Sequence, residues 1–547
     1  MELEPPTSPP IQTGIVLDHP PPPPPPFSVF HHRFLPPPSR AFLPFPLNPS
    51  FFFAMDSQRS ISLLQFMADE GLVPSPEEEE KRKNAIQKLK QIVSSWIKKV
   101  AWQHRLPKHQ IAVTSATILT YGSYGLGVHS SESDIDALCV APFYASIAED
   151  FFVVLHHMLK RRPEVSEILC VKSAKVPLIR FKFDGISIDL PYARLKVLYV
   201  PENVDILNPF FMRNIDDTSW KSLSGVRANK RILQLVPNVE NFQSVLRCLK
   251  LWAKRRGVYG TLLGYLGGVH LAVLVAYVCQ RHPDATLNGL IANFFRTFAF
   301  WPWPTPVMLQ EGMLPTVVDA IETRSFMPIL LPSSPYEYCH SNITKSTFYR
   351  IRAEFLRGHN ITRDLSKPDF IWDIVFELFP YSKRYTQFVK IYLSTPDQRA
   401  LGDWVGWVKS RFRGLLGILE GVQGFCDPNP TEYVDTNKTE PNVVFYWGLQ
   451  HDKYNLVDID LVEGEFMKII NNGYEGSLGK MELSILLASQ LPKNSQFDER
   501  SVKGRKTCWR IIDYDKKRSH VYSNHLPHCL IGHVTPSSEA ECLSSGS

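Results

Sequence analysis

The spacing of apolar residues predicts one long helix followed by a set of short strands in the first part of the chain. Ile86, Leu89, Val93 and Trp96 recur at helical spacing behind acids at 77–80, which suit the positive end of a helix. The lysines on its other face are most simply solvated. Apolar runs of strand length follow at 117–121, 137–140, 168–171, 176–183 and 186–190. A helix is predicted among them at 148–160. We therefore predict a compact mixed α/β unit, preceded by a short helix at 61–70.

The pattern changes twice more along the chain. From about residue 196 it is mostly helical, and the clearest helices lie at 244–256 and 264–278. From about residue 369, strand and helix patterns alternate over the segments 381–394, 404–422, 443–448, 456–461, 466–471 (a helix) and 509–513. These shifts predict an α+β multidomain protein with units at 57–195, 196–368 and 369–518.

Both ends differ in composition from these units. Residues 1–56 carry an unbroken proline run at 20–26 and further prolines, so we predict a disordered or polyproline II tail. That tail could bind a proline-recognising domain or be a dispensable extension, and Met55 at its end could serve as an alternative start. Residues 519–547 are polar, and we expect a flexible C-terminal tail.

Composition narrows the class of protein. The net charge of +6, from 60 basic and 54 acidic residues, is mildly basic and compatible with nucleic-acid contacts. The nine cysteines contain no Cys-x-x-Cys pair, so we interpret them as reduced thiols of an intracellular protein. No apolar run is long enough to span a bilayer, and no signal peptide is expected. We predict no membrane partner.

The chemically informative stretch runs from residue 121 to residue 140. Gly122 and Ser123 form a small-residue turn that a ligand can approach closely, and a strand pattern containing Asp134 and Asp136 follows. Side chains alternate along a strand, so the two acids share a face roughly 7 Å apart and repel by roughly 2 kcal/mol at an effective dielectric of about 20. A divalent cation with oxygen ligands would relieve this repulsion; a solvated strand face is the other interpretation. The Gly-Ser turn favours a nucleotide-binding metal site.

A third acid could complete that site. Residues 183–190 indicate a hairpin turn and a strand on which Asp189 shares a face with Ser187. If this strand lies beside that of Asp134, the three carboxylates converge, and two Mg²⁺ ions could clamp an in-line displacement at a phosphate. The Gly-Ser turn would then hold the triphosphate. Taken separately, Asp189 could equally be a surface acid.

Ordered motifs continue along most of the chain. They begin with Gly-Ser at 122–123, Leu-Gly-Val-His at 126–129, Asp-Ile-Asp-Ala-Leu-Cys-Val at 134–140 and Phe-Asp-Gly-Ile-x-Ile-Asp at 183–189. They continue with Asn-Ile-Asp at 214–216, Leu-Val-Pro-Asn-Val at 235–239, Leu-Lys-Leu-Trp-Ala-Lys-Arg at 249–255, Gly-Tyr-Leu-Gly-Gly-Val at 264–269, Trp-Pro-Trp-Pro at 301–304 and Met-Pro-Ile at 327–329. This order, over about residues 60 to 515, resembles the eukaryotic poly(A) polymerases of the nucleotidyltransferase superfamily. It is similar to a short, plant-type form without the long basic C-terminal tail.

The resemblance implies a polymerase beta-like nucleotidyltransferase palm, a helical central domain and a C-terminal RNA-binding domain similar to an RNA-recognition (RRM) fold. By motif match it implies metal ligands, which would bind Mg²⁺ or alternatively Mn²⁺, at Asp134, Asp136 and Asp189. It implies ATP contacts from the palm at Tyr121, Gly122, Ser123, Ser130 and Asp189, and from the central domain at Lys250, Tyr259, Gly268 and Val269. Asp189 would also help to activate the RNA 3′-hydroxyl. Without the family, Lys250 could be solvated and Gly268 a helix-packing contact.

Some positions depart from the family pattern. Gly125 stands where a basic residue is usual, Arg180 replaces a lysine, and Thr261 replaces an asparagine that helps to read adenine. In the C-terminal unit, basic and aromatic residues interleave at 383–385, 390–392 and 409–413. They would suit phosphate contact and base stacking on single-stranded RNA, and an ordinary protein surface is the equally favoured interpretation.

The sequence therefore predicts template-independent addition of AMP from ATP to RNA 3′ ends, by a monomer that could bind cleavage and polyadenylation factors. The alternatives are a terminal nucleotidyltransferase with altered base or primer choice, and a catalytically inactive RNA-binding regulator. The resemblance implies a nuclear protein, and the missing basic tail leaves the cytoplasm as the alternative location.

Overall fold

The computed structural model describes residues 49–492, apart from residues 173, 311–324, 334–336, 451–457, 475, 477 and 478. The chain divides into two compact units, Met1–Phe53 and Ala54–Ser547, and every element after α1 (Pro49–Asp69) belongs to the second. Helix α1 reaches into the range predicted as the proline-rich tail. Residues 1–48, the segment predicted at 509–513 and the predicted C-terminal tail lie outside the described residues.

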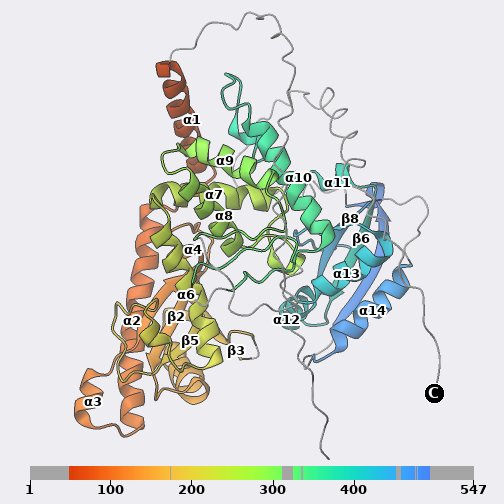
Figure 1. Cartoon of the computed structure of the whole chain (residues 1–547). Coiled ribbons are helices and arrows are strands. Elements are labelled where there is room, and N and C mark those ends of the chain that lie inside the picture. Colours follow the sequence, from red (N-terminus) through yellow and green to blue (C-terminus); the bar gives the residue numbers. More distant parts are fainter. Residues whose placement is uncertain are drawn as a thin grey trace, which may run out of the picture. The chain divides into compact units, whose positions relative to one another are not determined.

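A five-stranded sheet with surrounding helices forms the first part of the second unit (Figure 1). Its strand order is β1-β2-β5-β4-β3, in which β2 and β5 run parallel and the other neighbours run antiparallel. The helices of this part are α2 (Pro76–Gln103), α3 (Lys108–Val113), α4 (Gly122–Gly125), η1 (Ile147–Leu155) and α5 (His156–Lys160). The strands are β1 (Thr117–Tyr121), β2 (Ile135–Pro142), β3 (Val165–Val171), β4 (Leu178–Phe183) and β5 (Ile186–Leu195).

Alternation along β2 divides its side chains between two cores. Ile135 and Ala137 lie in the core that contains the apolar face of α2. Leu138 and Val140 lie in a separate core with residues of α6 (Asp217–Leu235), on the opposite face of the sheet. Asp136 has the same parity as Leu138, so it belongs to the face that α6 partly covers.

Helices dominate the next part of the chain. They are η2 (Pro209–Met212), α6, α7 (Val239–Arg255), η3 (Thr261–Leu263), α8 (Gly268–Arg281), α9 (Leu287–Ala299), α10 (Lys345–Thr362), η5 (Trp372–Ile374) and α11 (Tyr381–Arg384). The fully buried Trp252 of α7 stacks on Phe355 of α10 with ring centroids 5.7 Å apart and meets Phe295 of α9 edge-on. This aromatic packing fixes α7 against its neighbours. None of the helices in the described part of the chain is both long and apolar enough to cross a membrane.

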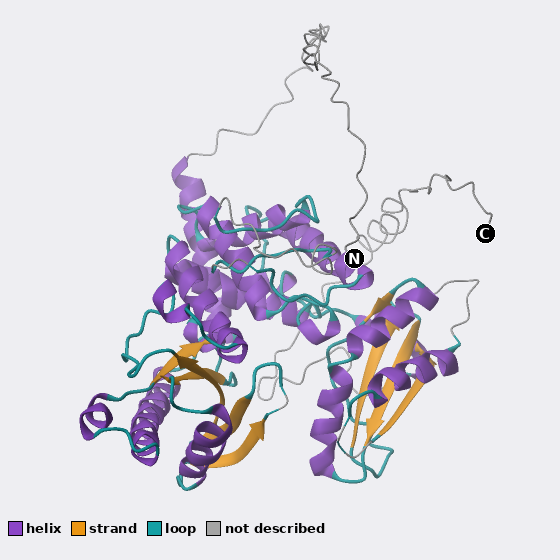
Figure 2. Ribbon diagram, turned by 60° about the horizontal axis from the view of Figure 1, so that its bottom comes forward, coloured by secondary structure: helices purple, strands orange, loops and turns teal. Residues whose placement is uncertain are grey.

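The last described part forms a four-stranded antiparallel sheet in the order β7-β8-β6-β9 (Figure 2). Its elements are β6 (Gln387–Ser394), α12 (Gln398–Lys409), α13 (Phe412–Gln423), β7 (Cys426–Asp427), β8 (Asn442–Leu449), α14 (Ile459–Asn471), β9 (Lys480–Leu487) and η6 (Ala488–Gln490). Apart from the extra helix, their sequence of strand, helix, two strands, helix and strand is that of a split βαβ unit.

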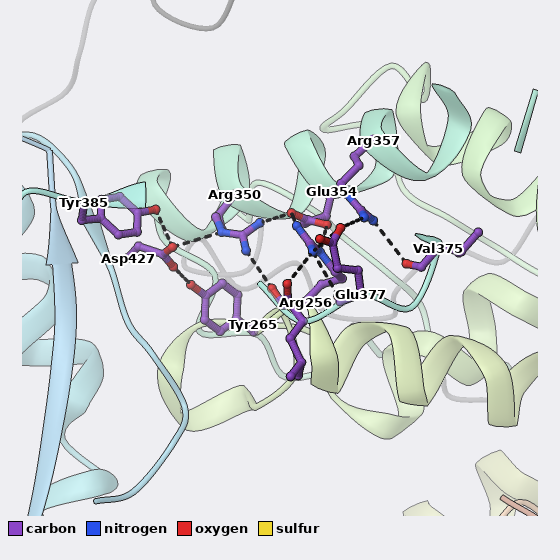
Figure 3. A network of polar contacts seen from close by, with 10 residues as sticks. Arg256, Tyr265, Arg350, Glu354, Arg357, Val375, Glu377, Tyr385 and Asp427 are labelled. Atoms are coloured by element: carbon purple, nitrogen blue, oxygen red, sulfur yellow. Dashed lines mark hydrogen bonds and ion pairs between the residues drawn. The ribbon is translucent and has the colours of Figure 1, made fainter. Parts of the chain in front are cut away.

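A buried ionic network joins α7, α10 and β7 (Figure 3). Arg350 donates hydrogen bonds to Glu354 at 2.7 Å and to Asp427 at 3.0 Å, and Arg256 donates to both oxygens of Glu354 at 2.7 and 3.1 Å. The hydroxyl of Tyr385 donates to Asp427 at 2.5 Å. All four charged groups are buried, so each depends on its partners for compensation.

Two predicted elements have other limits in the structure. The helix predicted at 264–278 starts only at Gly268, because Gly264 adopts a left-handed conformation with φ of +80°. Residues 459–461 of the segment predicted at 456–461 and the helix predicted at 466–471 belong to the single helix α14, where the Asp458 side chain caps the backbone N–H of Leu461 at 3.1 Å.

Candidate active site

The candidate acids lie in a row across the five-stranded sheet. The register pairs Tyr121 of β1 with Asp136 of β2, Asp136 with Asp189 of β5, and Asp189 with Arg180 of β4. Directly opposed residues on neighbouring strands point to the same face, with side chains starting about 5 Å apart. The predicted neighbourhood of the two acid-bearing strands is therefore observed. Asp134 lies one residue before β2 and is exposed.

Gly122 makes room for the carboxylate of Asp136. A Cβ atom on Gly122 would overlap Asp136 Oδ2, and the φ of +61° is one that side-chain-bearing residues rarely adopt. The carbonyl of Gly122 accepts a hydrogen bond from Asn229 Nδ2 of α6 at 2.9 Å. Ser123, half-buried in α4, follows directly, and its carbonyl accepts from the N–H of Val128 at 2.8 Å.

Ionisation of one side chain in the row makes ionisation of its neighbours less favourable. Burial, with the charges of Asp134 and Asp189, raises the pKa of Asp136 to about 7, while Lys250 opposes the rise. Burial, followed by the charges of Asp136, Asp189 and Asp134, raises the pKa of Tyr121, so its phenol stays protonated near neutral pH. A cation beside Asp136 would therefore be stabilised.

Lys250 of α7 faces these acids. Burial and the nearby Lys254 lower its pKa to about 8, and the charges of Asp134 and Asp136 act in the opposite direction. The ammonium group is within electrostatic reach of both acids, and it remains mostly charged at neutral pH.

Gly268 and Val269 begin α8, and the hydroxyl of Tyr259, from the segment before α8, lies next to Gly268. Burial and the charges of Asp134 and Asp136 raise the pKa of Tyr259, and a Cβ on Gly268 would lie 3.3 Å from the Tyr259 hydroxyl. Val269 is half-buried next to them. The structure thus gathers the residues predicted from α7 and α8 near the acid row.

A polar ridge on α7 holds the loop that follows Ser123. Gln243 and Lys250 donate to the carbonyls of residues 126 and 128 at 3.0 and 3.4 Å, and Arg247 donates to the carbonyl of residue 127. Gln243 and Arg247 were not predicted from the sequence. Their spacing with Lys250, at i, i+4 and i+7 on an amphipathic helix, was the available signal.

Arg82 of α2 holds the loop in front of Asp134. Its buried guanidinium donates to the carbonyls of Ser131 and Ser133 at 2.8 and 2.7 Å, and to that of Ser130 at 3.3 Å. The hydroxyls of Ser130 and Ser133 are 3.0 Å apart and share a hydrogen bond. Sequence analysis missed Arg82, because nothing local marks it among the charged residues of α2.

The residues present fit a divalent cation by their chemistry. Carboxylate oxygens are the ligands of hard cations, and Asp136 and Asp189 are adjacent and mutually repulsive. Arg180 donates to both oxygens of Asp189, each at 2.7 Å. Within the described ranges, no three His, Cys, Asp or Glu side chains are grouped closely enough to form a ready-made metal cluster.

The interleaved aromatic residues of the C-terminal sheet are not available for base stacking. Tyr385 is buried and bonded to Asp427, and Tyr392 is buried and donates to Glu440 at 2.9 Å. Lys390 pairs with Asp435 at 3.0 Å. The stacking prediction is therefore wrong for these two tyrosines, because both serve the packing of the sheet.

Comparison with known proteins places these features in a family. Residues 53–236 match the model of the poly(A) polymerase nucleotidyltransferase domain, and residues 241–378 match that of the poly(A) polymerase central domain. Nuclear poly(A) polymerase 3 of Arabidopsis thaliana is 60% identical over 486 residues, which cover 88% of this chain and 95% of that protein.

More distant relatives match a smaller share of their own length. Nuclear poly(A) polymerase 4 of Arabidopsis thaliana is 39% identical over 72% of this chain and 55% of its own, and the poly(A) polymerase of Dictyostelium discoideum is 36% identical over 77% and 54%. This chain spans about half the length of these two relatives. A solved structure of the Cid1 poly(U) polymerase aligns at 16% identity with a TM-score of 0.42, over 59% of this chain and 99% of its own, a likeness too low to carry an argument. The two family models and the 60% identity over nearly a whole relative show that the chain belongs to the poly(A) polymerase family.

Proposed function

We propose that this protein adds AMP from ATP to the 3′ ends of RNA without a template. The poly(A) polymerases to which the chain belongs are nucleotidyltransferases that add AMP to RNA 3′ ends. The observation that carries the proposal is the row of Asp136 and Asp189 on adjacent strands, with Gly122 against Asp136 and the charge of Lys250 acting on the same acid. The carboxylates of this row would bind a metal ion, and the adjacent glycine turn would let the backbone approach the triphosphate that the metal ion accompanies.

The nucleotidyltransferase fold implies dependence on a divalent cation, and we propose Mg²⁺ held by Asp134, Asp136 and Asp189. The bound cation would stabilise the charge that develops on the reacting phosphate. Asp189 would in addition lie close to the RNA 3′-hydroxyl and accept its proton as that oxygen attacks the α-phosphate, with pyrophosphate leaving.

The chain's other residues would bind and orient ATP. Lys250 offers a positive charge to the triphosphate, and the backbone at Gly122 and Ser123 offers N–H groups to the same anion. Tyr259 and Val269 would pack against the nucleoside, and Gly268 would let the backbone come close to it. Tyr121, protonated and paired in register with Asp136, would donate a hydrogen bond to the nucleotide, and the hydroxyl of Ser130 would donate another.

The C-terminal sheet would hold the RNA. Its split βαβ order and antiparallel sheet support an RNA-recognition-like fold. With Tyr385 and Tyr392 buried, the exposed Lys383 and Arg384 of α11, which precedes β6, would bind the RNA through phosphate contacts rather than stacking. Contacts of this kind weaken as salt is added, which a filter-binding titration with oligo(A) would measure.

The names of the Arabidopsis relatives support a nuclear location for this chain. A fluorescent fusion of the full chain, imaged in plant cells against a nuclear marker, tests it; an exclusively cytoplasmic signal would contradict it. We further propose a monomer that binds cleavage and polyadenylation factors.

Primer extension tests the proposed activity. Purified protein is incubated with Mg²⁺, an oligo(A) primer and each nucleoside triphosphate in separate reactions. We expect extension with ATP in preference to GTP, CTP and UTP, and none in excess EDTA. No extension with any nucleotide would instead favour a catalytically inactive RNA-binding regulator.

Altered base choice is the second candidate, and it depends on Thr261. The Thr261 carbonyl accepts a hydrogen bond from Asn342 at 3.0 Å, and a Cβ atom on Gly267 would lie 2.6 Å from the Thr261 methyl group. The side chain is thus turned toward the backbone beside Gly268 and offers a methyl group where an amide would offer a donor. Preference for UTP or CTP in the same reactions would support this candidate.

A further inference from the structure

Arg180 is hydrogen-bonded to Asp189, one of the acids that the proposed function assigns to the metal. Its Nε and one terminal nitrogen donate to the two oxygens of Asp189, each at 2.7 Å, in the fork-to-fork geometry of a strong charge-assisted pair. The two residues are also register partners on β4 and β5, so the backbone holds them opposite each other.

The pair continues the row of acids across the sheet. Asp189 has Asp136 on one side and Arg180 on the other, and the charge of Asp134 also acts on Arg180. The guanidinium is therefore the nearest positive group on the β4 side of the row, while Lys250 acts from the α7 side. Arg180 already supplies the neutralising charge that Asp189 would otherwise take from a cation.

The two partners differ in how readily they can separate. The Asp189 side chain is only 15% exposed, whereas the Arg180 side chain is 56% exposed and can turn into solvent about its long stem. An exposed guanidinium keeps most of its hydration when it leaves, so release from the pair has a modest cost.

We propose that Arg180 is a built-in counter-ion that competes with the divalent cation for Asp189 and so sets the metal affinity of the site. The inference rests on the proposed function, because that assigns Asp189 to the metal. In the metal-free protein Arg180 holds Asp189 in place and suppresses its repulsion with Asp136. A cation that binds Asp189 competes with the guanidinium for the electron density of at least one Asp189 oxygen. Arg180 is a positioning residue in this account, because it acts through Asp189.

Lys182 offers a matched control on the same strand. It lies two residues further along β4 and therefore on the same face, carries the same charge, and pairs with Glu167 at 2.7 Å instead of with a site acid. Removing the charge of Arg180 or of Lys182 changes the electrostatic potential on this face of the sheet. Only Arg180 contacts Asp189 and so competes directly with the cation for it. At an ionic strength of 0.15 M the Debye length is about 8 Å, which further reduces the effect of Lys182.

The test measures Mn²⁺ binding to the full-length protein without ATP or RNA, by calorimetry or by the electron paramagnetic resonance signal of free Mn²⁺. Arg180→Gln removes the charge and the fork, Arg180→Lys removes only the fork, and Lys182→Gln is the control. Loss of a bidentate charged competitor should raise Mn²⁺ affinity about tenfold in Arg180→Gln and a few fold in Arg180→Lys, against less than about twofold in Lys182→Gln. In an Asp189→Asn background the gain from Arg180→Gln should disappear, since the contested ligand is gone.

Equal gains in Arg180→Gln and Lys182→Gln, or no gain in either Arg180 variant, would overturn the inference. Thermal unfolding in EDTA confirms that each variant is folded, and Arg180→Lys gives an independent reading should Arg180→Gln be unstable. The result is separable from the proposed function. If the protein extends RNA with ATP but the Arg180 substitutions do not change its Mn²⁺ affinity, only the counter-ion role of Arg180 is refuted. If the substitutions change the Mn²⁺ affinity but the protein extends no primer, only the proposed adenylyl transfer is refuted.

Discussion

Asp136 reaches its position because no side chain stands at Gly122. We predict that Gly122→Ala displaces the Asp136 carboxylate and lowers AMP incorporation at least about 100-fold, as misplacement of a catalytic group by about 1 Å does. Gly185→Ala is the matched control: Gly185 also has a positive φ, of +82°, but a Cβ there meets nothing within 4 Å. Both changes should cost about 1 kcal/mol of stability from backbone strain. Equal activity of the two variants in primer extension would contradict this role of Gly122.

The raised pKa of Asp136 predicts how the metal-free protein responds to pH. The folded-state pKa of about 7 lies above the unfolded value of 3.8, so the folded state binds the extra proton between these values, and stability falls as pH rises through that window. Asp136→Asn should therefore stabilise the protein in EDTA by about 1–2 kcal/mol at pH 8 and by almost nothing near pH 4. The value at pH 8 is smaller than the full pKa shift would give, because solvent relaxation around the buried charge reduces its cost.

Denaturant unfolding at the two pH values measures this difference. Asp184→Asn is the control, because Asp184 lies on the β4–β5 turn, is 47% exposed and pairs with Lys88 rather than with an acid. An Asp136→Asn variant no more stable than the wild type at pH 8 would show that burial and the neighbouring acids do not disfavour the Asp136 charge as described.

Single residues were predictable where a motif or a strand period marks them. Asp134, Asp136 and Asp189 stood out by their spacing, and the neighbouring β2 and β5 bring the last two together. The pairing of Asp189 with Arg180 was not predicted, although the two-residue turn at Asp184 and Gly185 sets the hairpin register that places the two residues opposite each other.

At the scale of elements, the charge of Glu354 on α10 compensates the buried guanidinium groups of Arg256 and Arg350, and so holds α10 against the end of α7. Burial raises the pKa of this carboxyl, but Arg256 and Arg350 outweigh it and lower the pKa to about 2. Glu354→Gln leaves two buried guanidinium groups undercompensated and should cost about 3–5 kcal/mol at neutral pH. Glu377→Gln, which changes a 62% exposed carboxylate in the same network, should cost less than about 1 kcal/mol.

The difference between Glu354→Gln and the wild type should also depend on pH. A folded pKa below the unfolded value makes the contribution of Glu354 complete above about pH 4.5, and it is lost as pH falls through about 2. Chemical denaturation of both proteins at pH 7 and at pH 3 measures this. A cost that stays constant over that range would mean that Glu354 acts through packing and not through its charge.

Elements with a long, regular apolar period were the predictable ones. The helix α2 follows its pattern closely, whereas the start of α8 depends on the left-handed Gly264, and β9 was not predicted at all. Residues of β9 pair with β6 over its whole length, and this pairing, not a strong local pattern, makes it a strand.

At the scale of the molecule, the candidate site draws its residues from two parts of the fold. The sheet supplies the acids and the Gly122 turn. The helix α7 supplies Lys250 and the ridge that holds residues 126–128, and the segment between α7 and α8 supplies Tyr259. Sequence analysis predicted this division from family resemblance. The limits of the three predicted domains, and the roles of the individual site residues, stay predictions.

The most direct test of the central claim is AMP incorporation in a single-turnover reaction with purified protein, Mg²⁺, ATP and an oligo(A) primer. The wild type is compared with Asp136→Ala and with Asp184→Asn as the control acid. The account predicts that Asp136→Ala abolishes incorporation while its thermal unfolding in EDTA stays at or above that of the wild type, and that Asp184→Asn incorporates AMP normally. Normal incorporation by folded Asp136→Ala would contradict the assignment of the acid row as the catalytic site.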